Sequence, residues 1–187
     1  MRRLAVLFLA TLLPIQAVCA ATTAYHLDAA DSTVAFETDF GPDLITGSIP
    51  LEKADLKFDN VANCTVDVAL DVTGAKASFP FAAQALKGPK VLAARDHPRM
   101  TFESTSVSLT DEAADVTGNL TIRGVTRAVT LRAQLFRPQG SGKGDLDHLT
   151  VTLTGKVNRS DFGATGGGEM VGDEVRIIIT ARIDAAG

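Results

Sequence analysis

The sequence has few of the residues that redox, metal and disulfide-rich proteins depend on. Its 187 residues include two cysteines, three histidines, one tyrosine and no tryptophan. Two cysteines cannot form the disulfide framework of a small secreted scaffold. His26, His97 and His148 lie too far apart for the spacing of metal ligands, and no Cys-X-X-Cys pair occurs. We therefore expect no metal site.

Basic and aromatic residues are also too scarce for a nucleic-acid-binding protein. Acidic residues outnumber basic ones by 22 to 18, which gives a formal net charge of -4, and aromatic residues make up 5% of the chain. Nucleic-acid binding needs a concentrated basic face, and stacking on bases needs aromatic side chains. The composition therefore argues against a nucleic-acid partner.

Sequence signatures of catalysis are missing as well. No Gly-X-Ser-X-Gly elbow occurs. The glycine-rich residues 140–144 lack the upstream glycine of a phosphate-binding loop, and Gly144 stands where Ser or Thr should bind magnesium. We therefore expect no enzyme and no catalytic residues, although a hydrolase with an unrecognised site stays open.

The first twenty residues have the three parts of a secretory signal peptide. Arg2 and Arg3 precede an apolar run from Leu4 to Ile15, and Val18 and Ala20 occupy the small positions before a cleavage site. The run is shorter than the ~20 apolar residues that span a bilayer. We expect cleavage after Ala20, a domain over residues 21–187, no transmembrane segment, and a periplasmic or secreted protein.

Strict alternation of apolar and polar residues predicts strands along most of the remaining chain. The predicted strands are 32–39, 44–58 with a bend at Gly47 and Pro50, 63–73, 99–109, 115–122, 128–137, 146–158 and 174–184. One helical stretch, residues 79–95, should be split by Pro89. An all-β fold of eight antiparallel strands follows, which the alternation alone leaves as either a closed barrel or a two-sheet sandwich.

Five short sequence blocks in a consistent order resemble the YceI-like family of exported lipid-binding proteins. The most specific is Gly-Asn-Leu-Thr-Ile-Arg-Gly-Val-Thr at residues 118–126. The others are residues 25–36, 97–105, 158–163 and 171–175. The resemblance implies a lipocalin-like, eight-stranded antiparallel barrel with one short broken helical insert. It also implies a polyisoprenoid or related lipid or quinone bound inside, and no catalysis.

The inward faces of the strands then predict the residues that line a ligand cavity. The expected lining residues are Phe36, Val66, Val68, Met100, Phe102, Leu120 and Leu131, with Phe79, Phe81 and Leu92 near the mouth. Phe162 should also turn inward, with Arg159 meeting an acid at the end of its strand. Cys64 lies on an apolar strand face and is expected to act as a small buried hydrophobe.

These residues leave two functions open. One is an exported carrier or sensor that binds a long apolar chain inside the barrel. The alternative is an exported, non-catalytic interaction module with a filled core that acts through its acidic surface. The size of the interior side chains distinguishes them, and the many small and medium residues favour a cavity. A homodimer also stays open.

Overall fold

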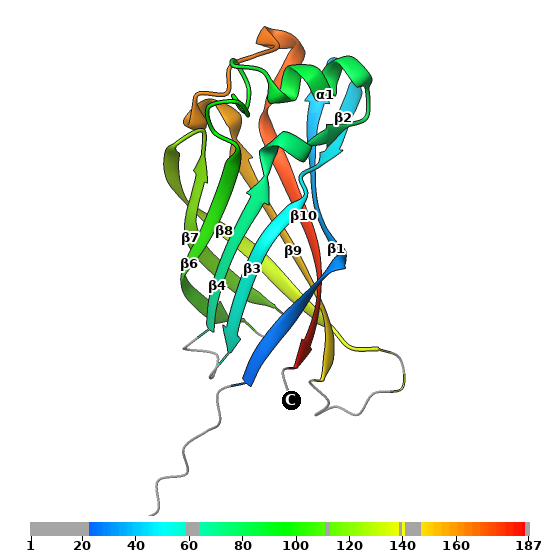
Figure 1. Ribbon diagram of the computed structural model, residues 1–187, viewed down its shortest axis with the longest axis vertical. Helices are drawn as coiled ribbons and strands as arrows, with labels where there is room; N and C mark the ends of the chain where they lie inside the picture. The colour runs from blue at the N-terminus through cyan, green and yellow to red at the C-terminus, as the bar shows by residue number, and fades with distance from the viewer. Residues whose placement is uncertain (1–22, 59–63, 111–112, 139, 141–146, 186–187) are drawn as a thin grey trace, which may run out of the picture.

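Eight long strands wind around one axis (Figure 1). The computed structural model describes residues 23–58, 64–110, 113–138, 140 and 147–185. The strands are β1 (Thr23–Phe40), β2 (Asp43–Ser48), β3 (Leu51–Phe58), β4 (Cys64–Asp71), β5 (Lys76–Ala77), β6 (Arg99–Leu109), β7 (Ala114–Ile122), β8 (Val125–Phe136), β9 (His148–Asn158) and β10 (Val171–Ala185). The helical elements are α1 (Pro80–Lys87) and the 3-10 turns η2 (Val72–Gly74), η3 (Arg159–Phe162) and η4 (Gly168–Met170).

Pairing between the first and the last strand closes the sheet into a barrel. All strand pairs are antiparallel, and the order around the ring is β1, β3, β4, β6, β7, β8, β9 and β10. In the closing pair Phe36 lies opposite Ile177, and on the other side Ile177 lies opposite Gly155 of β9. Closure removes the exposed edges of an open sheet. The predicted eight-stranded antiparallel barrel is therefore confirmed, and a two-sheet sandwich is excluded.

The predicted strand 44–58 bends as expected and divides into β2 and β3. The break falls at Ile49 and Pro50, because proline has no backbone N–H to donate to a ladder. The two parts pair with different portions of β1: β3 with residues 23–25 and β2 with residues 35–40. This bend carries β2 toward the helix, where the short strand β5 pairs with it.

Strand β1 starts earlier than the sequence predicted, at Thr23 instead of Ser32. Its pairing with β10 is interrupted between Asp28 and Thr33. The Asp28 carboxylate accepts hydrogen bonds from the backbone N–H groups of Ala30 and Asp31, which stabilises an irregular bulge. A bulge breaks the two-residue period, so the alternation ahead of Ser32 did not indicate a strand.

The helical insert is shorter than predicted. Helix α1 begins with Pro80, a favoured first residue because its missing N–H has no partner in the first turn. It ends at Lys87, and Gly88 and Pro89 follow it. The chain then continues to His97 in hydrogen-bonded turns, with Ala93 in the left-handed region at φ 49°. Pro89 therefore ends the helix rather than dividing it into two.

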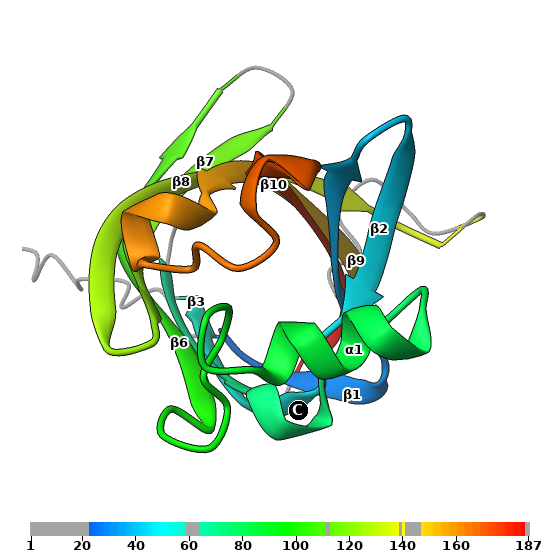
Figure 2. The same cartoon turned by 90° about the horizontal axis from the view of Figure 1, so that it is seen from above.

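The two ends of the barrel differ in structure. We call the end that carries α1, η3 and η4 the helical end, and we call residues 159–170 the η3–η4 segment. Seen from above, α1 lies along one side of this end and the η3–η4 segment along another (Figure 2). At the opposite end Tyr25, Leu149 and Ile183 form a small buried cluster. Among the described residues, no helix is long and apolar enough to cross a membrane.

Candidate functional site

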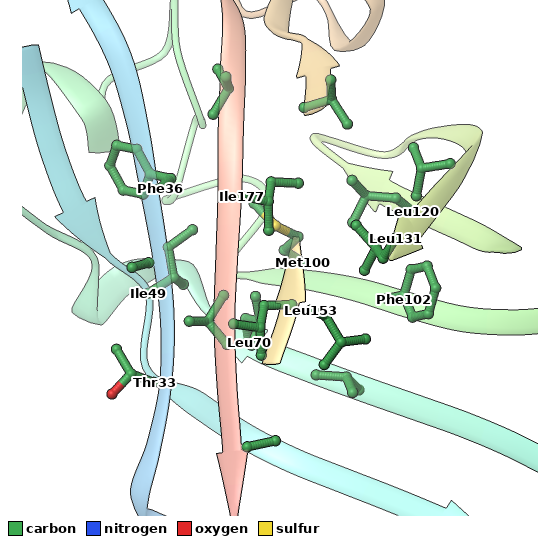
Figure 3. Close-up of a pocket in the computed structure, with 18 of the residues that line it drawn as sticks. Thr33, Phe36, Ile49, Leu70, Met100, Phe102, Leu120, Leu131, Leu153 and Ile177 are labelled. Carbon is green, nitrogen blue, oxygen red and sulfur yellow. The ribbon is translucent and has the colours of Figure 1, made fainter. Parts of the chain in front are cut away.

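A cavity of about 840 Å³ occupies the interior of the barrel. Its lining comes from all eight barrel strands, and Figure 3 shows apolar side chains from several of them facing a common space. It extends from Phe81 and Leu86 of α1 at the helical end to Leu109 and Leu135 at the opposite end. The interior is therefore not a filled core, which removes the structural basis of the interaction-module alternative.

Alternation along each strand produces this apolar interior. On β4, Val66 and Val68 line the cavity, while Thr65 and Asp67, at the alternate positions, are exposed. On β6, Met100 and Phe102 face inward and are each 8% exposed, whereas Glu103 is exposed. Since neighbouring strands are paired in register, inward positions align around the barrel, as with Phe102 of β6 opposite Leu120 of β7.

Glycines on neighbouring strands hold two of the inward phenylalanines, Phe36 and Phe102, against the wall. A Cβ atom at Gly47 would lie 2.6 Å from the Phe36 ring atom Cε1, and one at Gly118 would lie 2.5 Å from Cζ of Phe102. Both rings thus occupy space that another side chain would fill. This close packing of ring on glycine keeps the rings near the strands, so that the centre of the barrel stays open.

Nine of the ten predicted lining residues surround the cavity, namely Phe36, Val66, Val68, Phe81, Leu92, Met100, Phe102, Leu120 and Leu131. The exception is Phe79, which lies outside the lining and stacks on Phe81 with ring centroids 5.5 Å apart and planes 9° apart. Leu92 was expected at the mouth, but it is 8% exposed and belongs to the buried core. That these residues contact a ligand stays a prediction.

Several lining residues were not on the predicted list. Ile177 and Ile179 of β10 and Leu153 of β9 all face the cavity. The alternation of apolar residues on these two strands is visible in the sequence and predicts the strands, and the same alternation also indicates which residues face inward. Ile49 was harder to find, because it lies at the bend between β2 and β3, where no regular period applies; Ile45 lies on the short strand β2 before that bend.

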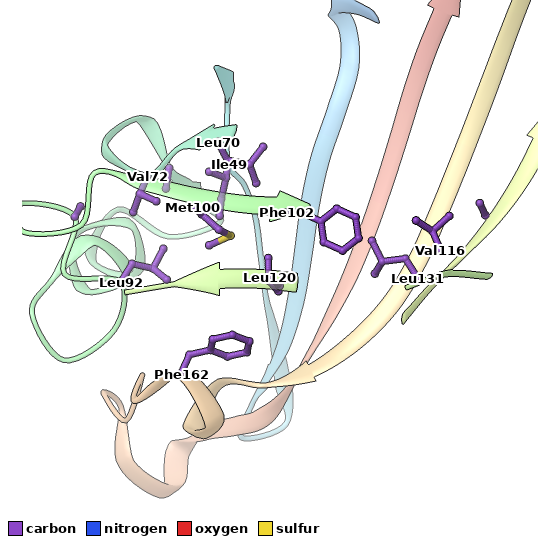
Figure 4. Packing of buried hydrophobic residues seen from close by; sticks show 13 residues of the cluster. Ile49, Leu70, Val72, Leu92, Met100, Phe102, Val116, Leu120, Leu131 and Phe162 are labelled. Atoms are coloured by element: carbon purple, nitrogen blue, oxygen red, sulfur yellow. The ribbon is translucent and has the colours of Figure 1, made fainter. Parts of the chain in front are cut away.

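Side chains of the turns close much of the helical end. Phe162 of η3 is 2% exposed and points inward, as predicted, toward the buried group that includes Leu92, Val72 and Leu120 (Figure 4). These residues come from four segments far apart in the sequence. Their packing anchors the turns after α1 and the η3–η4 segment to the barrel.

Arg159 organises the η3–η4 segment, although not by meeting an acid as predicted. Its guanidinium donates hydrogen bonds to the backbone carbonyls of residues 164, 166, 168, 171 and 172. The nearby carboxylate of Asp173 instead accepts bonds from the hydroxyl and backbone N–H of Ser160. These bonds, and more weakly the charge of Arg159, lower the pKa of Asp173. A planar five-donor group suits carbonyls that converge from a curved loop.

Polar groups in the lining are few, and they include Ser32 and Thr33 midway along β1. Thr38, the one buried polar residue of the described chain, has its hydroxyl 3.1 Å from the carbonyls of Gly172 and Glu174. Lys57 and Arg137 lie at the opposite end. Cys64, at the start of β4, also lines the cavity, and burial raises the pKa of its thiol above its ordinary value. The cavity is therefore suited to hold hydrocarbon, with few polar groups along its length.

Possible metal ligands do not gather at this site. Within residues 23–58, 64–110, 113–138, 140 and 147–185, no group of three or more His, Cys, Asp and Glu side chains is arranged to hold a metal ion. His148 instead contacts Asp184, with Nδ1 2.6 Å from the carboxylate.

Comparisons with solved structures identify the same barrel in other bacterial proteins. BcnA of Burkholderia cenocepacia superposes with a TM-score of 0.74 and 24% identity, over 84% of this chain and 99% of that protein. A polyisoprenoid binding domain from Saccharophagus degradans, implicated in plant cell wall breakdown, superposes with a TM-score of 0.64 and 13% identity, over 88% of this chain and 99% of the domain. At these identities the likeness establishes the fold.

Sequence comparisons establish the family. Protein YceI of Salmonella arizonae is 31% identical over 115 residues, which are 62% of this chain and 60% of the relative. The matched region thus spans well under two thirds of that relative. The family model of the YceI-like domain, however, matches residues 25–183, almost the whole of the described barrel. The chain therefore belongs to the YceI-like family.

Proposed function

We propose that this protein is an exported, non-catalytic carrier or sensor that holds one long apolar chain inside its barrel. The ligand class is a polyisoprenoid or a related lipid or quinone. The observation that supports this most directly is the cavity of about 840 Å³ with its almost continuous hydrocarbon lining. Pockets of roughly 300–1,000 Å³ are typical of bound small molecules and cofactors.

Burial of hydrocarbon supplies enough free energy for such binding. Each buried methylene contributes about 0.8 kcal/mol, so a chain of about fifteen carbons gains roughly 12 kcal/mol before costs. Lost translational and rotational freedom subtracts at least about 4 kcal/mol. At most about 8 kcal/mol remains, which corresponds to a dissociation constant in the micromolar range without any specific head-group contact. The polar groups at the two ends of the cavity would then orient the ligand.

The relatives support the same ligand class. The structurally similar domain from Saccharophagus degradans is described as polyisoprenoid-binding. A barrel that encloses an elongated apolar cavity suits a linear chain better than a compact polar molecule, because a linear chain contacts inward side chains along several strands.

Export follows from the N-terminal sequence. Residues 1–20 lie outside the described residues, and the proposal rests on their basic start, apolar run and small residues before Ala21. Protein recovered from the periplasm or the medium should begin at Ala21 on N-terminal sequencing. Recovery of exported protein with Met1 still in place would contradict a cleaved signal.

The ligand is tested by extracting the protein after purification from a bacterium that exports it. Organic extraction and mass spectrometry should recover a long isoprenoid, quinone or fatty chain in near-stoichiometric amount. Delipidated protein should then bind a fluorescent isoprenoid saturably, with one site per chain. An empty extract together with no saturable binding would contradict the proposal. Steady turnover of ester, phosphate or glycoside substrates would contradict its non-catalytic part.

A further inference from the structure

We propose that residues 72–95, which include α1 and are called here the α1 segment, dock the helical end of the barrel on an anionic lipid surface. The inference goes beyond the bound ligand, since it concerns where the barrel loads or releases it. It rests on three features of this segment: its charge, its exposed aromatic side chain and its position beside the cavity.

The α1 segment is basic in a chain that is acidic overall. It contains Lys76, Lys87, Lys90 and Arg95 and no acidic residue, although Asp71 and Asp96 flank it directly, and the whole chain has a net charge of -4. All four basic side chains are exposed, and in the described part of the chain no carboxylate forms an ion pair with them. A local cluster of unpaired cations is attracted to anionic lipid head groups.

An aromatic side chain projects from the same segment. Phe81 is 63% exposed although it belongs to the most apolar part of the insert, and its ring is supported from below by stacking on the half-buried Phe79. Because stacking already restricts the Phe81 ring, contact with lipid would cost little further side-chain entropy. Helices that lie at a membrane interface combine an aromatic or aliphatic face with flanking lysines, which is the arrangement found here.

The docking surface is continuous with the cavity. Phe81 lines the cavity as well as facing solvent, and Ala82, Ala85 and Leu86 of the same helix also line it. Figure 2 shows α1 along the rim of the helical end. Contact between this rim and a membrane would let a long apolar chain pass from bilayer to barrel without crossing water, which removes most of the hydration cost of transfer.

Other charges restrict the contact to one side of the helical end. Asp43, at the start of β2, Asp96, directly after the α1 segment, and Asp161 and Glu169, in the η3–η4 segment, are exposed at this end but lie outside the α1 segment. The barrel should therefore approach the membrane tilted, with α1 nearest the surface. At the opposite end, basic Lys57 and acidic Asp115 mix both signs.

Flotation with defined vesicles tests the proposal. The wild type, without added isoprenoid, should bind vesicles of phosphatidylglycerol mixed with phosphatidylcholine, should not bind phosphatidylcholine alone, and should be released by salt. The double variant Lys87→Gln/Lys90→Gln should bind about 25-fold more weakly, at about fivefold for each lysine. Phe81→Ser should weaken binding by at least about tenfold.

Matched controls lie away from the α1 segment. Phe136 is 51% exposed on β8 at the opposite end, so Phe136→Ser removes a similar exposed ring. Lys53→Gln removes an exposed lysine of β3 that, unlike Lys87 and Lys90, is ion-paired, here with Asp55. Both should bind vesicles like the wild type. No binding of the wild type to anionic vesicles, equal binding to neutral ones, or unchanged binding of the α1 variants would overturn the proposal. Because the isoprenoid titration is performed without vesicles, its outcome is independent of this one.

Discussion

Replacing Val66 with tryptophan should block the barrel while the fold survives. Val66 lies on β4, opposite Leu56 of β3, and its side chain is half-buried and faces the cavity. An indole at this position would project into open space rather than into packed side chains. Overpacking of a filled core costs about 1–3 kcal/mol, and because the cavity accepts the ring we expect the low end of that range.

The loss of affinity follows from the hydrocarbon that the ring displaces. Tryptophan adds about seven heavy atoms to the valine side chain, and we take these to exclude about four carbons of the ligand chain. At about 0.8 kcal/mol for each methylene, the loss is about 3 kcal/mol. That corresponds to a dissociation constant roughly 100-fold higher than that of the wild type.

The assay is titration of a fluorescent isoprenoid into delipidated wild type, Val66→Trp and the control Asp67→Asn. Asp67 is the next residue, and its exposed side chain lies on the outer face opposite Asp55 and Glu103. Asp67→Asn should bind like the wild type and, by removing repulsion between like charges on adjacent strands, should raise the melting temperature slightly. Equal affinity of the wild type and a folded Val66→Trp variant would refute binding inside the barrel.

Three further outcomes follow from the structure. Gly118→Ala should destabilise the protein by about 1–3 kcal/mol in denaturant unfolding, because the new Cβ would meet the Phe102 ring and a backbone carbonyl at 2.5 Å; a change below 0.5 kcal/mol would contradict the close packing. Arg159→Lys should lose about 2–4 kcal/mol, since an ammonium cannot replace the converging bonds of the guanidinium, and cleavage within the η3–η4 segment should accelerate in limited proteolysis. In a protein that starts at Ala21, alkylation of Cys64 should be slow at pH 8 and should become faster as the pH approaches the raised pKa of the thiol, because the thiolate is the reactive form. Bound isoprenoid should slow the alkylation further, since Cys64 lines the cavity. Equal alkylation rates with and without isoprenoid would show that the ligand binds elsewhere.

The sequence by itself determined the strands and the character of the interior. Period-two alternation depends on backbone geometry alone, so the inward positions of β4, β6 and β7 were found by counting. The alternation gave no correct prediction where the backbone departs from regular strand geometry. The bulge after Asp28 concealed the first part of β1, and the bend at Pro50 concealed Ile49 as a lining residue.

The local chemistry of individual side chains was only partly predictable. Phe162 turned inward as expected because a large apolar ring gains most from burial. Arg159 could not be assigned its partners, since the carbonyls that it binds converge only when the η3–η4 segment folds back over the barrel. Likewise the stacking of Phe79 on Phe81, which places Phe79 outside the cavity, depends on where α1 begins.

Only the tertiary structure decided that the sheet closes and that its interior is hollow. Closure requires β1 and β10, at the two ends of the described chain, to pair, and no local pattern specifies a contact so distant in sequence. Hollowness depends on the difference between the volume that eight strands enclose and the volume of their inward side chains. The sequence lists those side chains, but the enclosed volume is set by strand tilt and register, which exist only in the folded barrel.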